Sequence, residues 1–210
     1  MEKEKFWSQY ADSFDELIEY VIGTKDMDIV KNEITKLKNL GNVLELGCGS
    51  GIYTNILSKN CKSILATDLS KEMVEYAKSK FSSCENVKVE QGDATNLQYE
   101  EESFDTVYMA NLLHVVPDYN AVMEQALKVL KKNGKIITLD FTMDGMRFID
   151  KISLIYRFMK VWGKPAVKAK KSKFSVSEIE ELFKDYNLKV ENVKMLGNKN
   201  KAILGIGIKP

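Results

Sequence analysis

The segment VLELGCGSG, residues 43–51, places three glycines in five positions directly after a short apolar run. Glycine loses more conformational freedom on folding than any other residue, so this cluster indicates that a partner must approach the bare backbone. A helix is expected over about 52–60, and a ligand at the loop would lie beside its positive end. The same spacing also fits a tight strand-to-helix turn with no ligand.

Two aspartates follow expected strands at positions that suit a nucleoside. Asp68 lies 19 residues after Gly49, where a carboxylate can accept hydrogen bonds from both ribose hydroxyls. Helix capping is its alternative role, although Ser70 is available for that. Asp93, in Q-G-D-A, can accept from an adenine amino group while the backbone N–H of Ala94 meets a ring nitrogen. Its alternative is a turn aspartate beside a glycine.

The glycine loop departs from the fingerprint of dinucleotide-binding proteins. That fingerprint, G-x-G-x-x-G, needs a third glycine at the position that Ile52 occupies here. Glu45, just before the loop, would repel a pyrophosphate but would suit a cation. These residues predict a ligand with a nucleoside and a positive charge, and without phosphate.

Alternating strands and helices are expected to position these residues. Five apolar runs predict strands, at 42–46, 63–67, 86–90, 104–110 and 134–141. Amphipathic stretches predict helices over 70–81 and 118–131, the second capped by Asp118 and ended by Asn133–Gly134. Such alternation is typical of a parallel sheet covered on both faces.

The two ends of the chain break this alternation. Apolar spacing predicts one helix from Phe6 to Val21 and another from Met27 to Leu37, which Gly41 would end in a left-handed cap. The aromatic residues of the first helix would form a wall of the site or belong to the core.

The C-terminal part begins with S-V-S-E at 175–178, a capping box that opens a helix to about residue 185. Two strands follow, near 188–196 and 201–208. Their short connection, 197–200, allows only an antiparallel pair.

Taken together, the motifs VLELGCGSGIYT, ATDLSKEMVEYA, QGDATNL and FDTVYMANLLHVV resemble those of class I S-adenosylmethionine-dependent methyltransferases that act on small molecules, quinones and lipids among them. The resemblance covers residues 40–140 and extends more loosely to the end of the chain. It implies an α/β, Rossmann-like, doubly wound sheet of seven strands, mostly parallel with the last strand antiparallel, and with helices on both faces. The antiparallel pair expected from the C-terminal sequence agrees with that fold.

The resemblance assigns nine residues to the cofactor S-adenosyl-L-methionine: Glu45, Gly47, Gly49, Asp68, Leu69, Met73, Asp93, Ala94 and Asn111. The first two glycines would lie against the methionine part, and Glu45 near its ammonium group. Leu69 and Met73 would pack on the adenine, with ordinary core packing as their alternative. Asn111 would line the crevice beneath the sulfonium.

No conspicuous catalytic residue is needed, because a sulfonium is already an activated methyl donor and alignment alone accelerates transfer. A base is required only when the acceptor arrives protonated. His114, the sole histidine, could supply that base or could cap or pack at the start of the next helix. Cys48 is expected to be a packing residue, and no cluster of carboxylates and histidines suggests a metal site.

Residues 141–174 are expected to form a helical lid. An apolar stripe with spacings of four and three is formed by Phe148, Ile152, Ile155, Met159 and Trp162. The segment 146–173 contains nine basic residues and one acidic residue. One interpretation is a helix docked by this apolar stripe with its lysines in solvent. The other is a cover over the site that attracts an anionic or membrane-borne acceptor.

We therefore expect one domain over 1–210: a helical cap (1–41), a cofactor-binding core (42–140), the lid (141–174), and a last helix with two strands (175–210). A net charge of +1 gives no reason to expect nucleic acid, while unpaired cysteines and the absence of an apolar leader are typical of a cytoplasmic protein. The predicted activity is methyl transfer to a small-molecule or lipid-like acceptor. An NAD(P)-dependent oxidoreductase and a non-catalytic S-adenosylmethionine-binding regulator are the alternatives, and the oligomeric state is left open.

Overall fold

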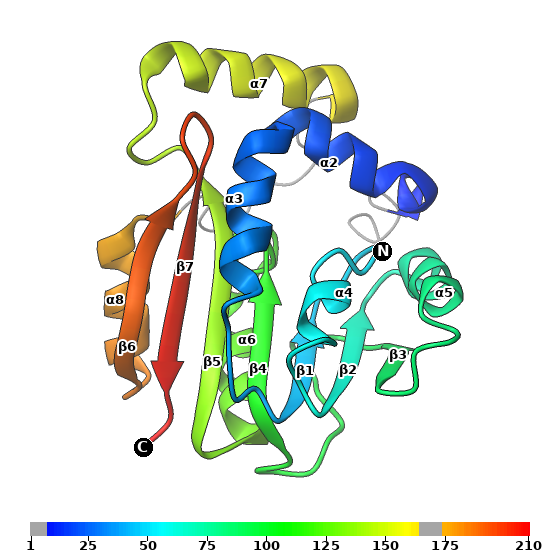
Figure 1. The fold of residues 1–210 in the computed structure, drawn as a ribbon. Coiled ribbons are helices and arrows are strands. Elements are labelled where there is room, and N and C mark those ends of the chain that lie inside the picture. Colours follow the sequence, from blue (N-terminus) through cyan, green and yellow to red (C-terminus); the bar gives the residue numbers. More distant parts are fainter. Residues whose placement is uncertain (1–7, 164–173) are drawn as a thin grey trace.

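Seven strands form one sheet in the order β3-β2-β1-β4-β5-β7-β6 in the computed structural model, which describes residues 8–163 and 174–210 (Figure 1). The strands are β1 Asn42–Leu46, β2 Ser63–Asp68, β3 Val87–Gln91, β4 Phe104–Ala110, β5 Leu130–Thr142, β6 Lys189–Leu196 and β7 Lys201–Ile208. Neighbouring strands from β3 to β5 pair in parallel, whereas β7 is antiparallel to both β5 and β6. The predicted fold class is confirmed.

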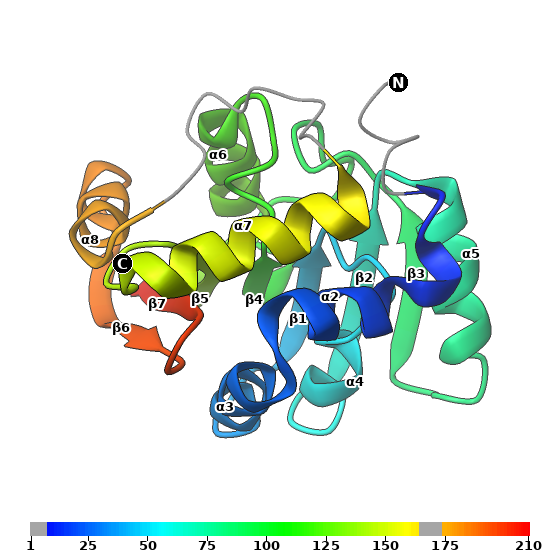
Figure 2. The ribbon, with the colours of Figure 1, turned by 90° about the horizontal axis from the view of Figure 1, so that it is seen from above.

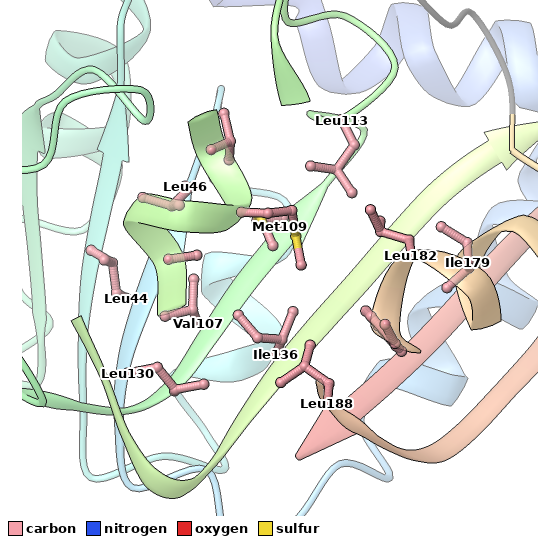
Figure 3. Packing of buried hydrophobic residues seen from close by; sticks show 14 of the residues in the cluster. Leu44, Leu46, Val107, Met109, Leu113, Leu130, Ile136, Ile179, Leu182 and Leu188 are labelled. Carbon is pink, nitrogen blue, oxygen red and sulfur yellow. The ribbon is translucent and has the colours of Figure 1, made fainter. Parts of the chain in front are cut away.

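Helices cover both faces of this sheet. They are the 3-10 turn η1 Ala11–Ser13 and the helices α2 Phe14–Ile22, α3 Thr24–Ile34, α4 Thr54–Leu57, α5 Lys71–Lys80, α6 Tyr119–Val129, α7 Phe148–Trp162 and α8 Val176–Asp185. Helices α6 and α8 pack on one face around Leu44, Met109 and Leu182 (Figure 3). Helices α3 and α4 pack on the other face, where Ile34 and Tyr108 are buried. Successive side chains of a strand point to opposite faces of the sheet. Because most of these side chains are apolar here, the sheet can be covered by helices on both faces.

The predicted caps at the N-termini of α5, α6 and α8 are present. Ser70 accepts a hydrogen bond from the backbone of Met73 at 3.2 Å, and Asp118 caps α6 through the backbone of Asn120. Ser175 and Glu178 form the reciprocal capping box at the start of α8. Each cap satisfies backbone donors that would otherwise lack a partner at the helix start.

Four predicted boundaries are wrong. The helix expected from Phe6 to Val21 is interrupted by a turn at 9–10 and by η1, so that α2 begins only at Phe14. Helix α3 ends at Ile34, so the left-handed Gly41 belongs to the loop before β1 and does not cap the helix. Helix α4 has only four residues, fewer than the expected 52–60. Helix α6 ends at Val129, because the next residue already pairs with β4 ahead of an irregularity in the register, and Asn133–Gly134 falls inside β5.

Helices α2 and α7 lie side by side beyond the carboxyl ends of the parallel strands (Figures 1 and 2). Helix α7 docks through Leu154, Phe158 and Trp162 against Phe14 of α2, and the Phe158 and Trp162 rings meet edge-on at 4.9 Å between centroids. Residues 1–7 and 164–173, which include Phe6, Trp7 and the basic tract after α7, lie outside the described residues.

The docking face of α7 differs from the predicted apolar stripe. Phe148 is 79% exposed, and Ile152, Ile155 and Met159 are also exposed, so of the stripe only Trp162 is buried. Hydrogen bonds from Arg157 hold α7 in this orientation. Its guanidinium group donates to the backbone carbonyl of Tyr20 at 3.3 Å and to the side chain of Asn200. The helix therefore presents an apolar face to the outside.

Candidate cofactor-binding site

The site lies where the strand order reverses, between β1 and β4. In doubly wound sheets, ligands bind at this switch point outside the carboxyl ends of the strands. Here the glycine loop follows β1, the Asp68 and Asp93 turns follow β2 and β3, and Asn111 follows β4. Parallel pairing thus brings four loops, predicted separately, to one edge of the sheet.

The glycine loop is folded back onto the end of β2. The N–H groups of Gly47 and Cys48 both donate to the carbonyl of Thr67, at 2.8 and 2.9 Å. Gly47, Gly49 and Gly51 all have positive φ, a region that favours glycine. A Cβ at Gly49 would meet nothing within 4 Å, so this residue borders open space in which a ligand can lie against the backbone.

Asp68 joins the glycine loop to the start of α5. One carboxylate oxygen accepts from the Gly49 N–H and the other from the Ser70 N–H, both at 2.9 Å. Burial raises the pKa of Asp68, and these backbone donors oppose the shift. Each oxygen retains a second lone pair, so the side chain can hold the loop and still accept from ribose hydroxyls.

Glu45 is 1% exposed within β1. Thr54, the first residue of α4, donates its hydroxyl to this carboxyl group at 2.6 Å. Burial raises the pKa of Glu45 from its usual 4.5 to about 8, with the Thr54 hydrogen bond opposing the shift. A buried carboxylate favours a cationic partner, which fits the predicted place beside an ammonium group.

The residues predicted to contact the adenine differ in exposure. Leu69 is 46% exposed, whereas Met73 is 2% exposed, so only Leu69 presents its side chain at the surface. Asp93 accepts from the backbone and hydroxyl of Thr95 at 2.8 and 2.7 Å, the arrangement of a turn aspartate, and both hydrogen bonds use the same carboxylate oxygen. Ala94 packs partly against the core beneath α6 and α8.

Asn111 ties β4 to β5. Its side-chain oxygen accepts from the Phe141 N–H at 3.1 Å, and its own N–H donates to the Leu139 carbonyl at 2.7 Å. With a φ of 54°, Asn111 turns the chain sharply, and the next residue, Leu112, comes within 3.0 Å of where a Gly47 Cβ would lie. The loop after β4 is thereby held against the glycine loop.

Sequence reasoning missed Asp140, which is buried at the end of β5 and contacts His114. A signal for it exists: Asp140 follows the apolar run KIITL just as Asp68 follows SILAT. It also missed the salt bridge between Lys80 and Asp15, 2.8 Å long, which fixes α2 beside the glycine loop. Cys48 is buried and its pKa is raised, which keeps the thiol protonated and agrees with a packing role.

These residues fit a nucleoside that carries a cationic amino-acid tail. Gly49 has an open side and is hydrogen-bonded to Asp68 at the end of β2, and the carboxyl group of Glu45 is buried in β1 just before the glycine loop. Ile52, which stands at the third-glycine position of dinucleotide-binding loops, packs against the core on the α3 side. The loop thus lacks the glycine that allows close helix–strand packing in dinucleotide-binding proteins.

Known proteins share this sequence and this fold. Residues 44–138 match the family model described as "Methyltransferase domain". A demethylmenaquinone methyltransferase from Staphylococcus aureus is 36% identical over 132 residues, which are 60% of this chain and 55% of that protein. The chain therefore spans about half the length of the curated relatives it matches.

Two solved structures align with nearly the whole chain. One, from Thermotoga maritima, is described as a possible histamine N-methyltransferase; it covers 98% of this chain and 99% of its own, with a TM-score of 0.73 at 19% identity. The other is a SAM-dependent methyltransferase from Aquifex aeolicus, with a TM-score of 0.66 at 18% identity over 95% of this chain and 97% of its own. Residues 44–138 are thus similar to a methyltransferase domain, and the chain has the same Rossmann-like fold as these two solved structures.

Proposed function

We propose that this protein transfers a methyl group from S-adenosylmethionine to a small-molecule or lipid-like acceptor. The observation that carries the proposal is the arrangement of Gly49, Asp68 and Glu45, with open backbone between two carboxyl groups at the switch point of the sheet. The same nine residues named from the sequence are proposed to bind the cofactor.

When bound, the cofactor supplies a methyl group on a positively charged sulfur. The chain's part is to align it: Asp68 would hold the ribose, the Gly47 to Gly49 backbone the methionine part, and Glu45 the ammonium group. Orientation of this kind contributes about 7–11 kcal/mol to lowering a barrier. The loop after β4, anchored by Asn111, would form the acceptor side of the crevice.

Two observations favour a lipid-like acceptor. The relative from Staphylococcus aureus is named for its action on demethylmenaquinone. In addition, the outward face of α7 carries exposed Phe148, Ile149, Ile152, Tyr156 and Met159. Helix α7 is the outermost helix on the edge where the site lies (Figure 1).

Transfer can be tested with S-adenosylmethionine labelled in its methyl group and a reduced, short-chain demethylmenaquinone. We expect label in the organic extract and release of S-adenosylhomocysteine only when protein and acceptor are both present. Cofactor binding with no transfer to any quinol, phenol or amine acceptor would instead support the non-catalytic regulator.

We propose that the exposed apolar face of α7 binds an anionic bilayer. The exposed apolar face of α7 is bordered by Lys151 and Lys160, and Asp150, the one acid between 146 and 173, pairs with Arg147 at 2.7 Å. An amphipathic helix with basic borders binds anionic surfaces in the interface plane. No helix within 8–163 or 174–210 has the length and apolar character to span a bilayer.

Flotation with vesicles that contain phosphatidylglycerol tests this contact at low salt. We expect the wild type to float and a Phe148→Ser/Ile152→Ser variant to stay at the bottom with unchanged cofactor affinity. Equal behaviour of the two proteins would remove α7 as the contact surface.

A further inference from the structure

The ring of His114 is hydrogen-bonded to the carboxylate of Asp140. The Nδ1 and Oδ1 atoms are 2.7 Å apart, and the two side chains are 25% and 2% exposed. Asp118, and not His114, caps the first turn of α6, so capping does not account for the His114 side chain.

Burial of Asp140 costs folding free energy, because a carboxylate in the protein interior loses its hydration. Burial raises the pKa of Asp140, and hydrogen bonds from the His114 ring and backbone oppose the shift. Its second oxygen, Oδ2, is buried and has no hydrogen-bond partner among the described residues. All hydrogen bonds to the Asp140 carboxylate in the described residues thus come from His114. This arrangement is consistent with a functional role for Asp140 in addition to a structural one.

The hydrogen bond determines the tautomer of His114. A carboxylate accepts a proton-bearing nitrogen, so Nδ1 carries the proton in the neutral ring and Nε2 keeps a free lone pair. In the described parts of the chain Nε2 has no hydrogen-bond partner, and the ring is partly exposed. Asp140 therefore orients the ring and would stabilise the imidazolium that forms when Nε2 takes up a proton, as in other aspartate–histidine pairs.

The pair lies at the site. His114 is two residues after Leu112, the side chain that closes on Gly47 of the glycine loop. Asp140 lies one residue before Phe141, which binds the Asn111 side chain. Both members thus lie near the carboxyl ends of β4 and β5, on the side of the switch point opposite Asp68.

From this geometry we infer that His114 is the general base of the reaction, positioned by Asp140, and that the acceptor is a molecule with an acidic hydroxyl group, such as a phenol or an enol. The inference rests on the proposed function. The hydroxyl proton passes to Nε2 of His114 while the acceptor forms its bond to the methyl carbon. The methyl–sulfur bond breaks, its electron pair remains on sulfur, and the imidazolium later releases the proton to solvent.

This assignment narrows the substrate class. A tertiary amine or a thioether already offers a lone pair and loses no proton on methylation, so neither needs a base. A phenol or an enol must lose its proton to become a strong nucleophile at oxygen or at the conjugated carbon. When the carbon attacks, it afterwards releases its own hydrogen as a proton, and the oxygen takes a proton back. The His114–Asp140 pair would therefore be unnecessary for a tertiary amine or a thioether and necessary for a phenol or an enol.

The tautomer can be measured without an acceptor, since the chain has a single histidine. Long-range proton–nitrogen NMR of the labelled protein, with S-adenosylhomocysteine added, reports which ring nitrogen carries the proton. We expect protonated Nδ1 and bare Nε2 in the wild type, and loss of this preference in Asp140→Asn. A wild-type ring protonated on Nε2 in its neutral form would overturn the inference.

Kinetics with reduced, short-chain demethylmenaquinone test the base directly. We expect His114→Ala to lower kcat about 10²- to 10⁴-fold with little change in KM, and added imidazole to restore part of the rate. Asp140→Asn should lower kcat less, and Asp118→Asn, a matched change in the same loop that preserves the cap of α6, should have no effect.

The outcomes separate the two proposals. Absence of S-adenosylhomocysteine binding in calorimetry would refute the proposed function whatever the NMR result. Binding together with a His114→Ala variant that keeps full kcat on this acceptor would refute the base alone. A His114→Ala variant whose lost rate is not restored at all by imidazole would also refute the base alone. A purely structural defect would not respond to a free base, whereas the loss of a base should.

Discussion

At the scale of residues, two of the glycines in the loop are required for different reasons. A Cβ at Gly51 would lie 2.4 Å from the ring of Phe81, so this glycine is required by packing. A Cβ at Gly49 would enter open space, so this glycine is required by its positive φ and by the ligand. One motif therefore combines a structural and a functional requirement, which the sequence alone cannot separate.

Alanine substitutions should reveal this difference. We expect Gly51→Ala to destabilise the fold by about 1–3 kcal/mol through overpacking. Gly49→Ala should cost only about 1–2 kcal/mol, from its left-handed backbone, but should weaken S-adenosylhomocysteine binding tenfold or more. Thermal unfolding and calorimetry measure the two effects. Unchanged affinity in the stable Gly49→Ala protein would contradict a ligand at this backbone.

Glu45 couples cofactor binding to pH. With a pKa of about 8 in the free protein, its carboxyl group is largely protonated at neutral pH and must ionise to pair with an ammonium group. Affinity should therefore increase as the pH rises from 6 to 8, with proton release on binding, and Glu45→Gln should abolish both effects. Calorimetry in buffers of different ionisation enthalpy measures the released proton.

The same shift predicts an effect on stability. Because the folded pKa of Glu45 lies above its usual 4.5, its contribution to stability is present below about pH 4.5 and is lost as the pH rises towards 8. Glu45→Gln should thus raise the melting temperature of the cofactor-free protein at pH 8 by a few degrees. A lower melting temperature for this variant would show that the carboxylate stabilises the free protein.

At the scale of elements, α7 illustrates what periodicity can and cannot predict. The helix itself was predictable, but apolar residues lie on two of its sides, and the spacing of Ile152 and Met159 is as regular as that of Leu154 and Phe158. The choice between the two sides depends on Arg157 reaching Tyr20 and Asn200, residues far away in sequence. Such long-range polar contacts do not appear in a local pattern.

Substitutions on the two sides of α7 should behave differently. Phe158→Ala removes a ring packed on Trp162 and should cost about 2 kcal/mol or more. Ile152→Ala changes an exposed side chain and should remain within about 0.5 kcal/mol of the wild type. Denaturant unfolding compares the two, and equal losses would contradict the docking described for α7.

At the scale of the whole molecule, the sheet could be predicted because its strands, caps and final hairpin each carry local signals. The site could be predicted in part: Asp68 and the glycines follow single strands, and parallel pairing brings strand ends together. The pairing of His114 with Asp140 could not, because it joins the loop after β4 to strand β5, which are brought together by the pairing of β4 with β5. Local patterns thus predicted the residues proposed to bind the cofactor, and tertiary contacts were needed to find the pair proposed to act on the acceptor.

The central claim is that the switch-point crevice binds a nucleoside with a cationic sulfur and no phosphate. Calorimetric titration of the purified protein with S-adenosylmethionine and, separately, with NADH tests it most directly. The account predicts saturable heat with S-adenosylmethionine, at least tenfold weaker binding in Asp68→Ala, and no heat with NADH. Saturable binding of NADH with none of S-adenosylmethionine would contradict it.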